Sequence, residues 1–188
     1  MFIQTETTPN PNTLKFLPGE PVSRGAVADY ASAEEATAQP LAASLFAVDG
    51  VARVFLGSDF VSVTKQAGAD WSVLKPMTLA AIMDYYVSGT HLRGDEAVAQ
   101  EGHSAHAEDD ENAELIVQIK ELLDTRVRPS VANDGGDIVF RRFEDGIVYL
   151  HMQGACSGCP SSTATLKHGI ENLLRYYVPE VQRVEAVD

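Results

Sequence analysis

Apolar and polar positions alternate over several short stretches in the first half of the chain. Residues 2–19, FIQTETTPNPNTLKFLPG, predict two short extended runs around a turn, because Pro9 and Pro11 exclude helix there. Residues 51–65, VARVFLGSDFVSVTK, alternate on both sides of a Gly-Ser-Asp turn at 57–59, which is typical of a β-hairpin. The first half therefore predicts short strands joined by tight turns.

Two helices are predicted in the same region. The run PLAASLFAV at 40–48 is rich in Ala and Leu and begins with proline, which suits a short helix. Residues 75–89, KPMTLAAIMDYYVSG, have helical spacing, with Pro76 near the start and Gly89 just past the end. The apolar face of this helix comprises Leu79, Ile82 and Tyr86. Strands and helices together predict a compact α+β unit that contains no cysteine.

The second half of the chain is framed by two amphipathic helices. Residues 113–131, AELIVQIKELLDTRVRPSV, carry an apolar stripe, and Pro129 is predicted to end this helix. The stripe comprises Leu115, Ile116, Ile119, Leu122 and Leu123. Another stripe runs from about Ser162 to Pro179. Its members are Leu166, Ile170, Leu173, Leu174 and Tyr177.

Strands are predicted between and after these helices. IVFRRF at 138–143 and IVYLHMQ at 147–153 flank an Asp-Gly turn, which is a hairpin pattern. NDGGD at 133–137 predicts a tight turn, because its two glycines can adopt positive φ. VQRVEAV at 181–187 predicts a last strand. The order is therefore α-β-β-α-β, and the fold class of the whole chain is predicted to be α+β, with two small domains.

An acidic segment separates the two halves. Residues 94–114, GDEAVAQEGHSAHAEDDENAE, contain eight acidic residues and no Lys or Arg. Such a composition buries too little apolar surface to offset the entropy of ordering, and its like charges repel. The prediction is a first domain at 1–93, a flexible linker at 94–113 and a second domain at 114–188.

The net charge and the apolar content of the chain indicate which partners and which cellular compartment to expect. The 27 acidic and 14 basic residues give a formal charge of −13, which opposes binding to nucleic acid. No apolar run approaches the ~18 residues of a membrane span. The first twenty residues resemble neither an export signal nor an Arg-rich presequence. We therefore expect a bacterial cytoplasmic protein without membrane or nucleic-acid partners, with a mature form from the mitochondrial matrix as the second choice.

The two cysteines of the chain lie together in GACSGCPSS, residues 154–162. Cys156 and Cys159 are predicted at the start of the last helix, with Ser161 or Ser162 as the N-cap. A helix N-terminus favours the thiolate form, which is the form that ligates metal or attacks disulfides. A reducing compartment also makes a catalytic or metal-binding role more common than a structural disulfide.

Three interpretations of this pair remain open from the residues. The two thiols could cycle between dithiol and disulfide within one chain, although a hairpin precedes them here rather than a thioredoxin-like parallel unit. Two chains could instead supply four thiolates to one metal centre across a two-fold axis. For that centre we favour a 4Fe-4S cluster over zinc, because Cys₄ zinc sites usually draw all four ligands from one chain. In the third interpretation both cysteines are packed as small residues.

Longer motifs resemble a known family. VRPSVANDGGDIVF at 127–140, GACSGCPSSTATLKHGIENLL at 154–174 and VPEV at 178–181 resemble the C-terminal domain of the NifU family, the Nfu-type iron–sulfur carriers. The likeness covers about 115–187. TETTPNPNTLKFLPG, FLGSDFVSVTK and WSVLKP in the first half are similar to the Nfu N-terminal domain.

The resemblance implies a carrier or scaffold and not an enzyme. It implies that Cys156 and Cys159 are the ligands through which a homodimer holds one 4Fe-4S cluster between its subunits. Upstream assembly proteins would supply the cluster, and apo iron–sulfur client proteins would receive it. The thiol-disulfide oxidoreductase is the alternative. Asp134 to Asp137 match the family motif and are interpreted as turn residues that shape the fold.

Overall fold

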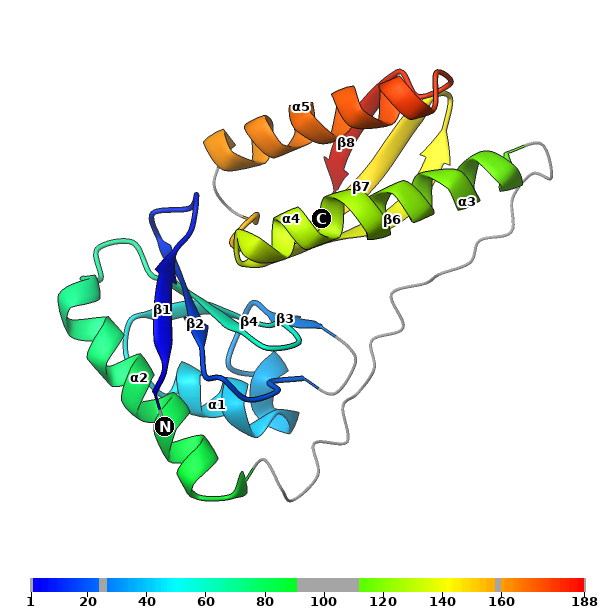
Figure 1. Cartoon of the computed structure of the whole chain (residues 1–188). Helices are drawn as coiled ribbons and strands as arrows, with labels where there is room; N and C mark the ends of the chain where they lie inside the picture. Colours follow the sequence, from blue (N-terminus) through cyan, green and yellow to red (C-terminus); the bar gives the residue numbers. More distant parts are fainter. Residues whose placement is uncertain (1, 24–26, 91–111, 158–159, 188) are drawn as a thin grey trace. The chain divides into compact units, whose positions relative to one another are not determined.

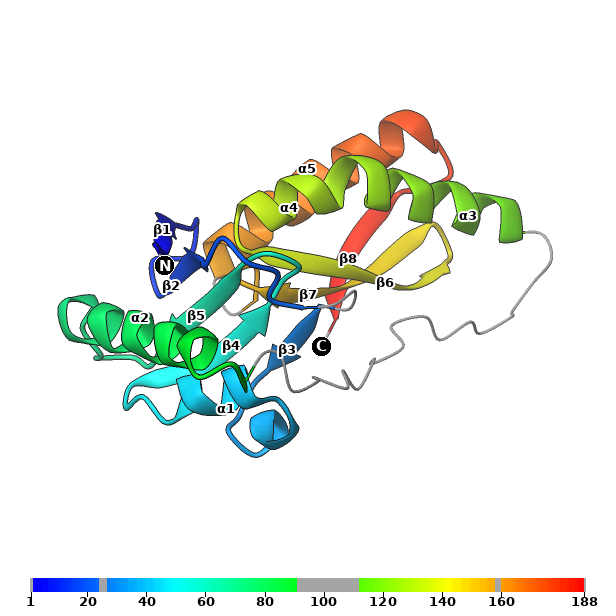
Figure 2. The same cartoon turned by 60° about the horizontal axis from the view of Figure 1, so that its bottom comes forward.

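The chain folds into two compact units, Met1–Gln100 and Glu101–Asp188, each with its own sheet (Figures 1 and 2). The computed structural model describes residues 2–23, 27–90, 112–157 and 160–187, the side chains of 160–162 excepted. The predicted α+β class with two domains is confirmed. The predicted linker at 94–113 falls almost wholly outside the described residues, so its boundaries stay a prediction.

The first unit is built on an antiparallel sheet with strand order β1-β2-β5-β4-β3. Its strands are β1 (Gln4–Thr7), β2 (Thr13–Leu17), β3 (Ala28–Tyr30), β4 (Val51–Leu56) and β5 (Val61–Lys65). The two predicted extended runs are β1 and β2, which pair with each other, and the predicted hairpin of β4 and β5 is confirmed. The sequence did not predict β3, because three residues are too few to show alternation and pairing with β4 defines this strand.

Helices cover this sheet and complete its core. They are the 3₁₀ helix η1 (Glu35–Ala38), α1 (Pro40–Phe46) and α2 (Trp71–Val87). Fully buried strand and helix residues form one cluster: Phe16, Val54, Val61, Val63, Leu41, Leu45 and Ile82. Burial of this apolar surface is the main contribution that holds the unit together.

The predicted start of the second helix was wrong. Helix α2 begins at Trp71, where the Asp70 side chain accepts a hydrogen bond from the Ser72 N–H at 2.8 Å, so Asp70 is its N-cap. Pro76 therefore lies inside the helix, where its missing N–H removes one backbone hydrogen bond. The predicted end is confirmed, since Gly89 follows the helix with φ +70°.

The second unit has a three-stranded sheet with two helical segments on one face, as Figure 2 shows. Its elements are α3 (Ala113–Leu122), the π-helical turn η3 (Leu123–Val127), α4 (Arg128–Asn133), β6 (Gly136–Glu144), β7 (Ile147–Gly154), α5 (Pro160–Tyr177) and β8 (Arg183–Val187). Strands β6 and β7 form the predicted hairpin, and β8 joins β7 in parallel after α5. The predicted α-β-β-α-β order is confirmed.

The prediction that Pro129 ends the first helix of this unit is wrong. The helical backbone continues from α3 through η3 into α4. In the π turn, the Arg128 N–H donates to the carbonyl of Leu123, five residues earlier. Pro129 then occupies the first turn of α4, directly after the π turn, so the helical backbone passes through this proline instead of ending at it.

The apolar stripes of α3 and α5 meet the sheet in a second core. Ile119, Val131, Val148, Leu150, Leu174 and Val184 are fully buried there. Along β7, buried positions alternate with half-buried ones, as expected when helices cover one face only. None of the described helices combines the length and apolar composition needed to cross a membrane.

Candidate functional site

Cys156 lies in the loop that leaves β7. Gly154, the last residue of that strand, has φ +64° and turns the chain, and the Ser157 N–H donates to its carbonyl at 3.1 Å. The Thr163 hydroxyl donates to the Cys156 carbonyl at 2.9 Å, which ties the loop to the first turn of α5. Cys159 lies outside the described residues, so its predicted role as the second ligand stays a prediction.

Two glycines contact the loop that carries Cys156, and we call Gly135 and Gly136 the glycine platform. Gly135 has φ +80°, and its carbonyl accepts a hydrogen bond from the Ala155 N–H at 3.1 Å. A Cβ added to Gly136 would lie 2.6 Å from Cys156 Sγ and 2.6 Å from the Gln153 carbonyl oxygen. Only a residue without a side chain therefore fits beneath this thiol.

The glycine platform is a feature that sequence reasoning recognised only in part. Gly135 shapes a turn, as predicted, but Gly136 is the first residue of β6 and pairs with Gly154 of β7. The sequence does show a glycine at the start of the first strand of the predicted hairpin and another at the end of the second strand. The meaning of these glycines depends on strand register, because register brings residues 18 positions apart in sequence beside each other.

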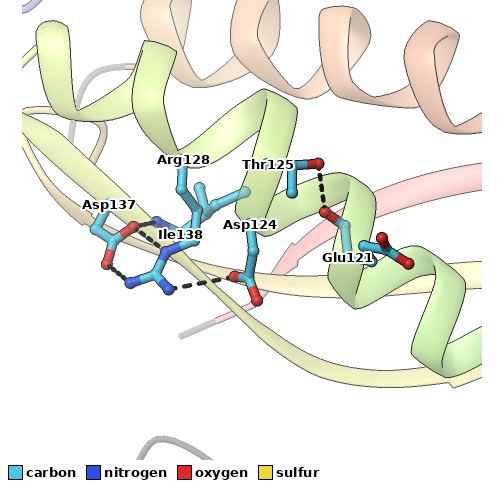
Figure 3. Close-up of polar contacts among 6 residues, drawn as sticks. All are labelled: Glu121, Asp124, Thr125, Arg128, Asp137 and Ile138. Carbon is cyan, nitrogen blue, oxygen red and sulfur yellow. Dashed lines mark hydrogen bonds and ion pairs between the residues drawn. The ribbon is translucent and has the colours of Figure 1, made fainter.

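Asp137, the residue after Gly136, forms an ion pair with Arg128, whose side chain is half-exposed; Figure 3 shows this pair. Asp137 is 4% exposed, and its two carboxylate oxygens accept hydrogen bonds from Arg128 Nε at 2.8 Å and Nη2 at 2.6 Å. The Ile138 N–H also donates to Asp137 Oδ1 at 2.8 Å. Hydrogen bonding to Asp137 raises the pKa of Arg128 above its ordinary value. The pair joins α4 to the start of β6.

The prediction that Cys156 is a thiolate at a helix N-terminus is not met by the described structure. The side chain is only 6% exposed, and burial, followed by the charges of Asp134 and Asp137, raises the pKa of Cys156 to about 12. Helix α5 begins at Pro160, four residues beyond the thiol, so its dipole acts weakly there. Ser161 and Ser162, predicted as N-caps, lie within the helix instead.

The raised pKa of Cys156 predicts that this thiol is alkylated slowly in the folded protein. In a metal-free Cys159→Ser protein, iodoacetamide should modify Cys156 at pH 8 roughly 10²–10³-fold more slowly than in the denatured chain, because little thiolate forms. Burial stabilises the protonated thiol, so this contribution to stability is complete below the unfolded pKa of ~8.5 and declines above it. The rate in the folded protein should keep rising from pH 7 to 10, and a plateau near pH 8.5 would contradict the assignment.

One chain supplies only part of a ligand set for metal. Among the residues that the structure describes, no group of three or more His, Cys, Asp and Glu side chains is placed to hold an ion. The sequence contains no cysteine besides Cys156 and Cys159. A four-thiolate centre would therefore need two copies of this loop.

Comparison with family profiles covers both units. The profile described as "Scaffold protein Nfu/NifU N terminal" matches residues 3–89, and the profile described as "NifU-like domain" matches residues 119–185. Similarity to curated relatives extends over the whole chain. The chain belongs to the Nfu/NifU family of scaffold proteins, as its motifs predicted.

Individual relatives carry names that state their role. The human protein "NFU1 iron-sulfur cluster scaffold homolog, mitochondrial" is 50% identical over 188 residues, which are 100% of this chain and 72% of the human one. "NifU-like protein 4, mitochondrial" of Arabidopsis thaliana is 54% identical over 187 residues, 98% of this chain and 65% of that protein. The solution structure of a NifU-like protein from Saccharomyces cerevisiae aligns with TM-score 0.43 and 28% identity, over 47% of this chain and 81% of that one.

These relatives contradict the expected bacterial cytoplasmic location. Both full-chain matches are named as mitochondrial proteins, at 50% and 54% identity. The expectation depends on the first twenty residues, and their composition does not separate bacterial cytoplasm from mitochondrial matrix.

Proposed function

We propose that this protein is a carrier that holds one 4Fe-4S cluster as cargo between two subunits and transfers it to apo-proteins. The ligands are Cys156 and Cys159 of each subunit. The observation that carries the proposal is the glycine platform under Cys156, in a chain that has one cysteine pair and belongs to a family of scaffold proteins.

Ligand number supports a site shared by two chains. A 4Fe-4S cluster takes one thiolate per iron, so four are needed. The sequence has two cysteines, and a two-fold symmetric pair of subunits supplies four. A loaded homodimer is therefore the state that completes the coordination.

The chemistry of the loop fits such a cargo. Burial raises the pKa of Cys156, and a coordinating metal removes the proton from a thiol. The Gly136 position leaves no side chain between the sulfur and the backbone of β6. Cluster uptake then releases protons, and the glycine platform lets the backbone remain close to the ligand.

The same proposal assigns the partners. A scaffold receives its cluster from upstream assembly proteins and passes it to apo iron–sulfur clients, without turning over a small substrate, so it is not an enzyme. The names of the relatives favour a mitochondrial setting for this exchange. A thiol-disulfide oxidoreductase would need a thiolate near neutral pH, whereas the pKa of Cys156 is raised.

Anaerobic reconstitution with iron and sulfide tests the function. We expect four iron and four sulfide per two chains, a Mössbauer spectrum of a 4Fe-4S cluster, and a dimer by native mass spectrometry. A monomer that takes up no cluster and forms a reversible Cys156–Cys159 disulfide would overturn the proposal in favour of thiol redox chemistry. A colourless dimer that retains zinc would overturn it as well.

A further inference from the structure

A carboxylate is buried next to the proposed cargo site. Asp137 directly follows Gly136, whose Cα lies beneath Cys156 Sγ. Both Asp137 oxygens accept hydrogen bonds, one from Arg128 Nη2 and the other from Arg128 Nε and the Ile138 N–H. Arg128 is thus the cation that permits an ionised carboxylate to remain buried at this position.

A π turn precedes Arg128 and helps to direct its side chain toward β6. The π turn at Leu123–Val127 adds a residue to the turn just before Arg128 and so changes the direction of the side chains that follow. Asp124, within this turn, accepts a hydrogen bond from Arg128 Nη1 at 3.2 Å. Figure 3 shows the guanidinium between the two carboxylates.

The charges of Arg128 and Asp137 are expected to influence a cluster bound through Cys156 Sγ. A Cβ on Gly136 would lie 2.6 Å from Cys156 Sγ, and Asp137 is the next residue of β6, so the ion pair lies one residue along the strand from the position nearest the sulfur. A thiolate-bound cluster is also negatively charged, and groups around a metal site tune its potential and retention. Since Asp137 is 4% exposed, solvent screens its charge weakly, and Arg128 provides the offset.

We propose that Arg128 is a positioning residue for the cargo site. Through Asp137 it holds Gly136 in place under Cys156, and its charge offsets that of the Asp137 carboxylate, one residue along β6 from this glycine. The pair thereby sets the reduction potential and the retention of the cluster. This inference rests on the proposed function.

If Arg128 and Asp137 act through their charges, substitution of one should shift the reduction potential in the opposite direction to substitution of the other. A purely structural role predicts no such opposition. Arg128→Gln leaves Asp137 without its cation, and the added negative charge makes reduction harder, so the potential moves to a more negative value. Asp137→Asn leaves Arg128 without its anion and moves the potential to a more positive value. The double variant Arg128→Gln/Asp137→Asn should lie near wild type. Arg128→Lys keeps the charge, so it should shift the potential least among the single variants.

The experiment reconstitutes the full chain and each variant, then measures the potential by redox titration and cluster loss to a chelator. Arg128→Gln should lose cluster roughly 10–100-fold faster than wild type. Arg142→Gln is the matched control: it removes the same charge from an exposed side chain on β6, about 20 Å along the strand from Gly136. This control should match wild type in both measurements.

Failure of the proposed function and of this inference give different results. A wild-type protein that binds no cluster contradicts the function. A wild-type protein that binds one, with single variants that shift its potential in the same direction or not at all, overturns the inference. Should Arg128→Gln fail to fold, Asp137→Asn and the double variant still test the opposite sign and its reversal.

A metal-free readout accompanies these measurements. In the Cys159→Ser background at one fixed pH, Arg128→Gln should slow alkylation of Cys156 and Asp137→Asn should accelerate it, each by several-fold, because only the local charge differs. Equal rates in both variants would contradict a charge effect at the sulfur, whether or not any cluster binds.

Discussion

Cys156→Ser and Cys159→Ser should each leave the protein folded and nearly without cluster. Either substitution reduces the thiolates of a two-subunit site from four to two, and a serine hydroxyl is a poor ligand for iron. We expect bound iron and sulfide to fall by roughly tenfold or more after reconstitution. Because Cys156 is buried, its replacement should also lower the free energy of unfolding by about 1 kcal/mol.

Ser157→Ala is the control for these variants, since it changes the same loop and keeps both cysteines. It should retain the wild-type content of iron and sulfide. Circular dichroism and thermal unfolding establish that each variant is folded. A folded Cys156→Ser protein with wild-type iron and sulfide would show that this residue is not a ligand.

Gly136→Ala should destabilise the protein and impair cluster uptake together. The added Cβ would lie 2.6 Å from Cys156 Sγ and 2.6 Å from the Gln153 carbonyl oxygen. Moving either neighbour costs free energy, because the Gln153 oxygen belongs to the backbone of β7 and Cys156 is packed in the core of the second unit. Overpacking of this kind costs about 1–3 kcal/mol of unfolding free energy, and the displaced thiol no longer points where the site needs it.

Gly169→Ala provides the matched comparison. Gly169 lies inside α5, and an added Cβ there meets nothing within 4 Å. Alanine in a helix interior should therefore raise the free energy of unfolding by about 0.5–1 kcal/mol and leave cluster content unchanged. Chemical denaturation and iron analysis of both variants test the pair of predictions. Wild-type stability and cluster content in Gly136→Ala would remove the platform from the proposed site.

Local pattern predicted most elements of the fold. The hairpin of β6 and β7 follows from its Asp-Gly turn, where Asp145 and Gly146 both have positive φ. The hairpin of β4 and β5 follows from alternation around its turn. Helix boundaries were less predictable at proline. Pro76 lies inside α2 and Pro129 at the start of α4, because an N-cap at Asp70 and a π turn before Arg128 set those backbones.

The sequence predicted which residues form the candidate site, but not what surrounds them. The spacing of Cys156 and Cys159 identified the residues that could bind a cluster. It did not indicate that Cys156 is buried or that its pKa is raised to about 12. Residues of β6 and β7 and the core of the second unit create that environment, and they come from distant parts of the sequence.

The sequence by itself determined the order of most strands and helices, the family and the single pair of cysteines. These properties depend on neighbouring residues, on periodicity and on residue identity. The tertiary structure decided that Gly136 lies under Cys156 and that Arg128 pairs with Asp137. Those contacts depend on the register of two strands and on the direction in which a π turn aims one side chain. Both are fixed only when the helices pack on the sheet, because burial of the shared core selects one register and one helix orientation.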